Sequence, residues 1–219
     1  MNSDFQIWLG VALFACVALT YLWQNPGLYR SRMGAAEIDA AMAEIEKLPL
    51  PPDERAELLL RARHWLETDD GKPVYMLNLM RFFPAVRQHP GARPFEGSPQ
   101  ESNALYERVA IPLLLKLGGY PLYAGVAQGA NLLEYAPELD KWNRVLVVRY
   151  PSRRSFIRLV TSAQYRQVAH YKLMALSVVL TPTSSELQIP NLTLLIAGVS
   201  SIIFLAVGWW QAASALAAH

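Results

Sequence analysis

The sequence has little that binds metals or forms cross-links, and few charges for its length. A single cysteine, Cys16, excludes an intrachain disulfide and a thiolate metal site. Only 17% of the 219 residues are charged, and the net charge of +2 is too small to suggest a nucleic-acid-binding protein. The sequence also has no glycine-rich phosphate loop and no Gly-x-Ser-x-Gly motif. The apolar fraction of 53% predicts a globular domain that carries a few membrane segments.

Charged residues are absent from a long run near the start of the sequence, residues 5–24. At about 1.5 Å per residue, a helix of this length spans a hydrocarbon core of about 30 Å. Trp8 lies near one end of the run, and Tyr21 and Trp23 lie near the other, as in an interfacial aromatic belt. A cleaved signal peptide is the alternative, but it favours Lys or Arg before the apolar run, where this chain has only MNSD. We therefore expect a transmembrane helix.

A second uncharged run, residues 192–213, ends in an aromatic pair, Trp209 and Trp210, and is predicted to be another transmembrane helix. Every Lys and Arg lies between the two runs, and Arg30 and Arg32 follow the first directly. Because positive charge favours the cytoplasmic side, we expect an inner-membrane protein with a cytoplasmic central part. Both termini would then lie on the other side.

Residues 34–67 are predicted to form a helical hairpin. Apolar residues recur at helical spacing over 34–47 and over 53–67, and prolines separate the two segments. Asp53 is the expected N-cap of the second helix. The hairpin could pack on the main domain or on the membrane surface, and the sequence does not distinguish the two.

Residues 72–183 are predicted to form an α+β domain of ferredoxin-like topology, with the order β-α-β-β-α-β. Its strands are expected at 73–82, 120–128, 143–150 and 178–183, and its helices at 105–119 and 153–177. Pro112 predicts a kink or break in the first helix. Since helices cover only one face of such a sheet, we expect a second copy or another protein to cover the other.

A resemblance to a known family is carried by PVYMLNLMRF, a helix ending in LGG, YPLYAGVA and WNRVLVVRYPSRRSFIRLVTSAQY. Over residues 72–183 the chain resembles an uncharacterised bacterial family, domain-of-unknown-function family 1330, of the dimeric α/β-barrel superfamily. The resemblance implies a ferredoxin-like fold whose sheets pair between two subunits around a central cavity. It implies no activity, since other branches of the superfamily include cofactor-free oxygenases, haem-degrading enzymes and small-molecule-binding proteins. Tyr171 and Lys172 stand where relatives often carry His-Arg, so no role is carried over to His170.

The candidate ligand-binding residues are Asn78, Met76, Met80 and Arg149. Strand alternation places Met76, Asn78 and Met80 on one face, which we expect to be the open face of the sheet. A buried Asn must be hydrogen-bonded, so Asn78 either contacts a ligand or closes an internal network. The two methionines would be adaptable apolar neighbours of a ligand.

Arg153 and Arg154 lie in the first turn of a predicted helix, where the helix dipole disfavours cations. An anionic ligand or anionic lipid headgroups would compensate, but so would solvent screening alone. His170 could bind haem iron or act as an acid–base group, yet it is a lone helical histidine, so we expect no metal and no cofactor.

These patterns favour a membrane-anchored accessory or small-molecule-binding protein. We expect it to form a homodimer or to be a subunit of a larger membrane complex, and we expect no nucleic-acid partner. The alternative is a small-molecule enzyme of the dimeric α/β-barrel type: a cofactor-free oxygenase or, with less support, a haem-dependent enzyme. An enzyme needs a cavity with convergent polar groups, whereas an accessory subunit needs a helix-binding surface in the bilayer.

Overall fold

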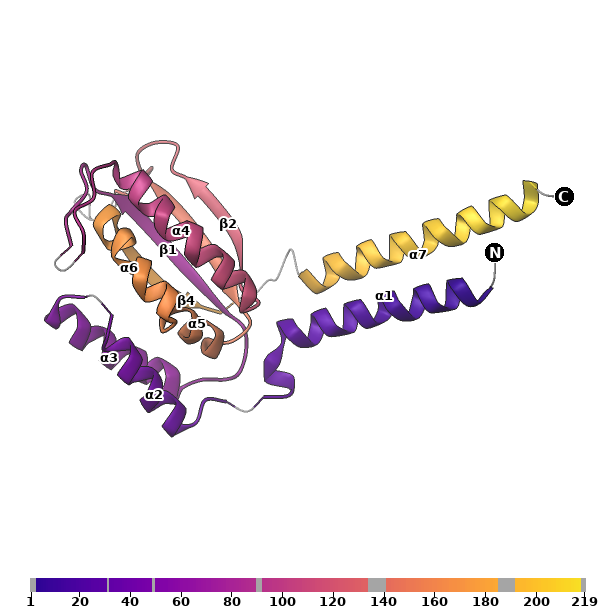
Figure 1. Ribbon diagram of the computed structural model, residues 1–219, viewed down its shortest axis with the longest axis horizontal. Helices are drawn as coiled ribbons and strands as arrows, with labels where there is room; N and C mark the ends of the chain where they lie inside the picture. The colour runs from indigo at the N-terminus through magenta and orange to yellow at the C-terminus, as the bar shows by residue number, and fades with distance from the viewer. Residues whose placement is uncertain are drawn as a thin grey trace.

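The computed structural model describes residues 3–30, 32–48, 50–89, 92–133, 141–184 and 192–217 (Figure 1). An α/β domain lies at one end of the molecule, with a helical hairpin packed beside it. Two long helices, α1 (Ser3–Gln24) and α7 (Leu192–Ala217), extend side by side from the domain. The start of α1 and the end of α7 both lie at the end of this pair that is remote from the domain.

The domain is a mixed α+β structure built on one antiparallel sheet. Its strands are β1 (Val74–Phe82), β2 (Tyr120–Val126), β3 (Arg144–Tyr150) and β4 (Leu176–Thr183). They pair in the spatial order β2-β3-β1-β4. Three helices cover one face: α4 (Pro99–Lys116), α5 (Arg153–Val160) and α6 (Ala163–Ala175). The order along the chain is therefore β-α-β-β-α-β, with the second helical segment divided in two.

The single helix predicted over 153–177 is wrong. α5 ends at Val160, and the Ser162 hydroxyl caps α6 by accepting a hydrogen bond from the Tyr165 N–H at 3.2 Å. An internal N-cap gives the second helix its own start, because it satisfies a backbone donor that has no partner within the helix. β4 consequently begins at Leu176, directly after α6.

The first domain helix begins six residues earlier than predicted. Ser98 and Glu101 form a capping box, in which the Ser98 side chain accepts from the Glu101 N–H and the Glu101 carboxylate accepts from the Ser98 N–H. α4 then continues through Pro112 without a break.

The hairpin consists of α2 (Ala35–Ile45) and α3 (Pro52–Glu67), preceded by a short 3-10 turn η1 (Pro26–Leu28). It packs on α5 and α6 and shares a hydrophobic core with them, which answers the question that the sequence left open. Leu66 is completely buried there, and Ile157 and Val160 of α5 belong to the same core. The predicted Asp53 cap is wrong: Pro51 is the N-cap residue, and Pro52 begins the helix with its preset backbone angle.

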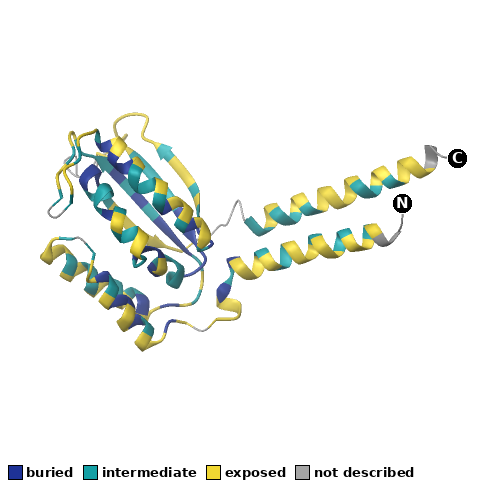
Figure 2. Cartoon of the chain, viewed as in Figure 1, coloured by how far each residue is buried: buried dark blue, intermediate teal, exposed yellow. Residues whose placement is uncertain are grey.

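α1 and α7 are long and apolar enough to cross a membrane. Their mean hydropathies are 1.9 over Phe5–Gln24 and 2.2 over Leu192–Ala215. Signal sequences and long core helices meet the same criteria of length and composition, but almost none of either span is buried in the molecule (Figure 2). The helices contact each other where the Gln6 amide donates a hydrogen bond to the Phe204 carbonyl at 3.2 Å.

Candidate functional site

A polar cluster lies between the sheet and the helices that cover it, centred on a lysine. We call it the Lys172 cluster; its members are Asn78 of β1, Tyr106 and Glu107 of α4, Arg144 of β3, and Tyr165 and Lys172 of α6. The Lys172 amine donates a long hydrogen bond of 3.5 Å to the Asn78 Oδ1. The same amine lies 5.4 Å from the centre of the Tyr106 ring, close enough for a cation–π contact.

The predicted face of β1 is wrong. Met76, Asn78 and Met80 share a face as expected, but it is the face covered by helices rather than the open one. Met76 packs in one core with Leu114 of α4 and Leu159 of α5. Period-two alternation separates the two faces of a strand, but it does not say which face receives the helices.

Asn78 is held by the backbone around it. Its amide nitrogen donates to the Met76 carbonyl at 3.1 Å and to the Leu146 carbonyl at 3.2 Å, and the residue is only 5% exposed. These two bonds orient the side-chain oxygen toward Lys172. Of the two possibilities raised by the sequence, the internal network is therefore present, and a ligand contact stays a prediction.

The Lys172 amine has no carboxylate within ion-pairing distance among the residues that the structure describes. The nearby Glu107 is instead paired with Arg144, with the guanidinium 2.5 Å from the carboxylate oxygen. Burial lowers the pKa of Lys172 to about 8; the Glu107 carboxylate opposes this shift, and the Arg144 guanidinium adds to it. About a tenth of the amine is then neutral at pH 7, against well under a thousandth for an ordinary lysine.

Tyrosines form the apolar side of the cluster. The Tyr106 and Tyr165 hydroxyls lie 3.4 Å apart, and the two rings meet nearly at right angles, with centres separated by 5.7 Å. Burial raises the pKa of both phenols, and also that of Tyr150, so all three stay protonated at neutral pH. The Lys172 amine therefore faces the ring of an uncharged phenol, Tyr106, on this side.

Arg149 lies on the opposite face of the sheet from Asn78, paired across the strands with Tyr75. It is 5% exposed, and its guanidinium donates to the Gln24 side-chain oxygen and, at 3.0 Å, to the Gln24 carbonyl. Gln24 in turn donates to the Gly118 carbonyl at 3.1 Å. Gln24 is the last residue of α1, so the cation caps the negative end of that helix dipole. Arg149 thus joins α1 to the sheet, and ligand binding by this residue stays a prediction.

Arg153 and Arg154 both lie near carboxylates of the protein itself, and an anion or lipid-headgroup site at these residues stays a prediction. Arg154 binds Glu37 of α2 through two hydrogen bonds of 2.5 and 2.8 Å. Arg153 bonds the Trp65 carbonyl and lies 3.7 Å from an Asp69 oxygen. Through these contacts the two arginines of α5 bind both helices of the hairpin to the domain.

His170 lies apart from the Lys172 cluster, because two residues along a helix rotate the side chain to the other side. The His89 ring lies 6.4 Å from it between ring centres. Burial, and after it the charge of His89, lowers the pKa of His170. No group of three or more potential metal ligands occurs within the described ranges.

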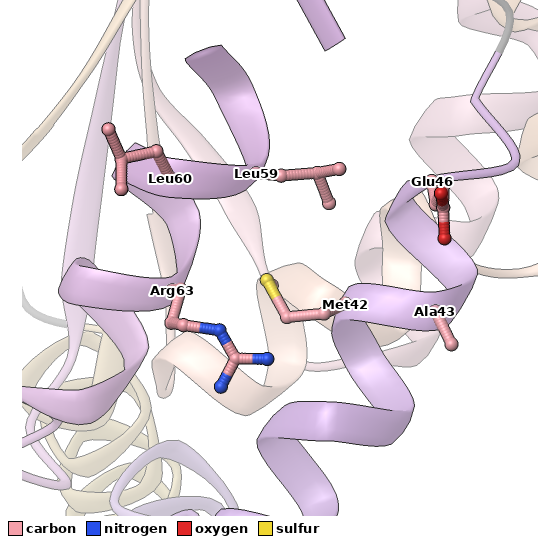
Figure 3. A pocket seen from close by; sticks show the side chains of 6 residues that line it. All are labelled: Met42, Ala43, Glu46, Leu59, Leu60 and Arg63. Carbon is pink, nitrogen blue, oxygen red and sulfur yellow. The ribbon is translucent and has the colours of Figure 1, made fainter. Parts of the chain in front are cut away.

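An open depression of about 450 Å³ lies between α2 and α3 (Figure 3). Its lining is mostly apolar, comprising Met42, Ala43, Glu46, Leu59, Leu60 and Arg63. Arg63 is already paired with Asp39 at 2.9 Å. The depression therefore has no convergent polar groups of the kind that an active site needs.

Sequence reasoning missed two central residues, Lys172 and Gln24. Lys172 lies on one helical stripe with Tyr165 and Ala169, so a charged residue on an apolar stripe was the available signal. Gln24 is the last polar residue of an uncharged run and carries no comparable signal.

Comparisons with known proteins define the fold and no activity. No family model and no curated protein sequence matches the chain, so membership of family 1330 stays a prediction. The domain is similar to RPA0582, a protein of unknown function from Rhodopseudomonas palustris, at 24% identity and a TM-score of 0.52, covering 64% of this chain and 98% of that one. The methylated form of that protein matches at 25% identity and a TM-score of 0.51, covering 65% and 96%.

A more distant similarity is to SnoaB, a cofactor-independent oxygenase from Streptomyces nogalater. The identity is 12% and the TM-score 0.35, covering 55% of this chain and 99% of that one. This is too low to support an inference about activity.

Proposed function

We propose that this chain is a membrane-anchored accessory protein, with a ferredoxin-like domain held at the cytoplasmic face of the membrane by α1 and α7. The observation that carries the proposal is the buried link between Arg149 and Gln24. It joins the sheet to the end of an apolar helix at a fixed position, which suits a domain that must keep one orientation at a membrane.

The exposed surface of the two helices supports membrane insertion. Large apolar side chains lie open along both, among them Phe14 at 75%, Ile202 at 68% and Trp209 at 78%. Water-soluble proteins rarely expose so continuous an apolar surface. Lipid would cover it along the full length of the pair.

Charge supports the proposed orientation, and the uncovered sheet face supports a partner. Arg30 and Arg32 are exposed just after α1, and positive charge favours the cytoplasmic side. On the open face, Tyr123 is 59% and Val179 is 44% exposed. A second copy of the chain or a subunit of a larger membrane complex would cover these side chains.

Membrane fractionation followed by purification tests this function. We expect the chain to stay in the membrane pellet after alkaline carbonate washing, and a mild detergent extract to yield a stoichiometric partner by mass spectrometry. The matched control carries Phe14→Lys and Ile202→Lys, which place charges at the centre of each span and should release the chain. Release of the unaltered chain into the wash would refute the membrane attachment.

A second candidate function, small-molecule binding with or without catalysis, is favoured by the Lys172 cluster. A thermal-shift screen of small organic acids and carbonyl compounds would identify a ligand. We expect Asn78→Ala to weaken its binding, and His170→Ala to leave binding within a few-fold, because Asn78 contacts Lys172 whereas His170 lies outside the cluster. We also expect no haem in the purified protein; a stoichiometric Soret band that His170→Ala abolishes would contradict this.

A further inference from the structure

We infer that Lys172 is a carbonyl-reactive amine, which forms an imine with a small aldehyde or ketone that enters the cluster between the sheet and the helices. The inference rests on the second candidate function, small-molecule binding, and does not depend on membrane attachment. None of the other lysines within the described ranges has this setting. Lys47, for example, has a 59% exposed side chain and is paired with Glu44 at 2.5 Å.

The geometry leaves the amine weakly held. Its hydrogen bond to the Asn78 oxygen is 3.5 Å long, which is at the limit for such a bond. Its other neighbour is the face of the Tyr106 ring at 5.4 Å. An amine with one long hydrogen bond and no carboxylate partner can turn toward a reacting carbon without losing a strong interaction.

The surrounding charges favour the neutral, nucleophilic form. Groups near the amine come from three elements around it: Asn78 from β1, Arg144 from β3, and Tyr106 and Glu107 from α4. The only carboxylate among them, that of Glu107, is neutralised by Arg144. Burial of a lysine next to another cation is the arrangement that activates lysine toward carbonyl substrates, and here it lowers the pKa of Lys172 to about 8.

The reaction is balanced without an oxidant or a metal. The Nζ lone pair attacks the carbonyl carbon and forms a carbinolamine. Both amine hydrogens end on the former carbonyl oxygen, which leaves as water while the C=N bond forms. The product is an uncharged imine next to the Tyr106 ring, which limits the access of water that would hydrolyse it.

Reductive trapping tests the inference. The full-length chain in detergent is incubated at pH 7 with acetaldehyde and cyanoborohydride, and ethylated lysines are quantified by peptide mass spectrometry. We expect Lys172 to be modified at least tenfold faster than Lys47. At pH 7 the neutral fraction of a lysine with a pKa near 8 is about 250-fold larger than that of an ordinary lysine. The lower exposure of Lys172 offsets part of this advantage. The Lys172 rate should also level off above pH 8, while the Lys47 rate continues to rise.

Two variants and one unfolded sample are the controls. Arg144→Gln removes the neighbouring cation and frees the Glu107 charge, so it should slow Lys172 labelling at pH 7 and leave Lys47 unchanged. Lys172→Arg should abolish the fast-reacting site, and unfolding in urea should make the two lysines equal. A Lys172 that labels no faster than Lys47 in the folded chain overturns the inference. If a ligand still binds and Asn78→Ala weakens that binding, small-molecule binding stands without the imine.

Discussion

Replacing Arg149 by methionine should destabilise the protein strongly, because it removes the buried link between α1 and the sheet. The guanidinium donates to two oxygens of Gln24, and it is only 5% exposed. Hydrogen bonds from a charged group contribute about 1.5–3 kcal/mol each, so two of them predict a loss of about 3–6 kcal/mol. Methionine keeps most of the apolar stem, so the loss reports mainly on the polar contacts.

Urea unfolding of the full chain in detergent, followed by tryptophan fluorescence, measures this loss. With a urea slope of about 2 kcal/mol per M, the midpoint should fall by about 1.5–3 M. Arg158→Met is the matched control, since Arg158 is exposed on α5 and its replacement should change the midpoint little.

The partner residue gives a second measure of the same link. Gln24→Leu removes one acceptor from a buried cation and should cost at least as much as Arg149→Met, because an unpaired buried charge is more costly than an unpaired amide. If Arg149→Met shifts the midpoint no more than Arg158→Met, the link does not stabilise the fold and the reasoning fails.

Three further predictions follow from the other sites. Lys172→Met should stabilise the chain by up to about 3 kcal/mol at pH 7, because a native pKa of about 8 disfavours the charged amine relative to the unfolded chain. Thermal melts should show the stability difference between variant and wild type shrinking between pH 8 and pH 10. A difference at pH 10 equal to that at pH 7 would contradict the prediction. Glu37→Gln should cost about 1 kcal/mol of stability at pH 7, since the Arg154 hydrogen bonds lower the pKa of Glu37. In the wild type this stabilisation is present above the ordinary carboxyl pKa and is lost as the pH falls through the lowered pKa of Glu37. Acid unfolding of the variant should therefore lack this loss of stability. Cysteines introduced at positions 3 and 217 should react only from the non-cytoplasmic side, and labelling of either from the cytoplasm would refute the topology.

The strands and their positions along the chain were predictable from local patterns. β3 is rich in β-branched residues, and the positions of all four strands were predicted to within two residues at each end. The division between α5 and α6 was not, because Ser162 is one polar residue among several in that stretch, and its role as a cap depends on where the chain turns.

The site was predictable only in part, for a physical reason. Asn78 was identified as a buried polar residue, but its face depends on where the helices pack, and that depends on the whole chain. The role of Arg149 depends on Gln24, which lies 125 positions away in the sequence. No periodicity or motif connects two such residues, so only the folded structure shows the contact.

The double attachment of the domain restricts how copies of the chain can meet. α1 joins the domain at Gln24, and α7 follows the last strand. Because the domain is attached to two helices that contact each other, its rotation about the axis of either helix is restricted. The link at Arg149 fixes the sheet relative to α1. With α1 and α7 in a bilayer, the open sheet face would keep one tilt relative to the lipid plane. Encounters between two such faces then become a search in two dimensions, in which lateral diffusion and rotation about the membrane normal replace tumbling.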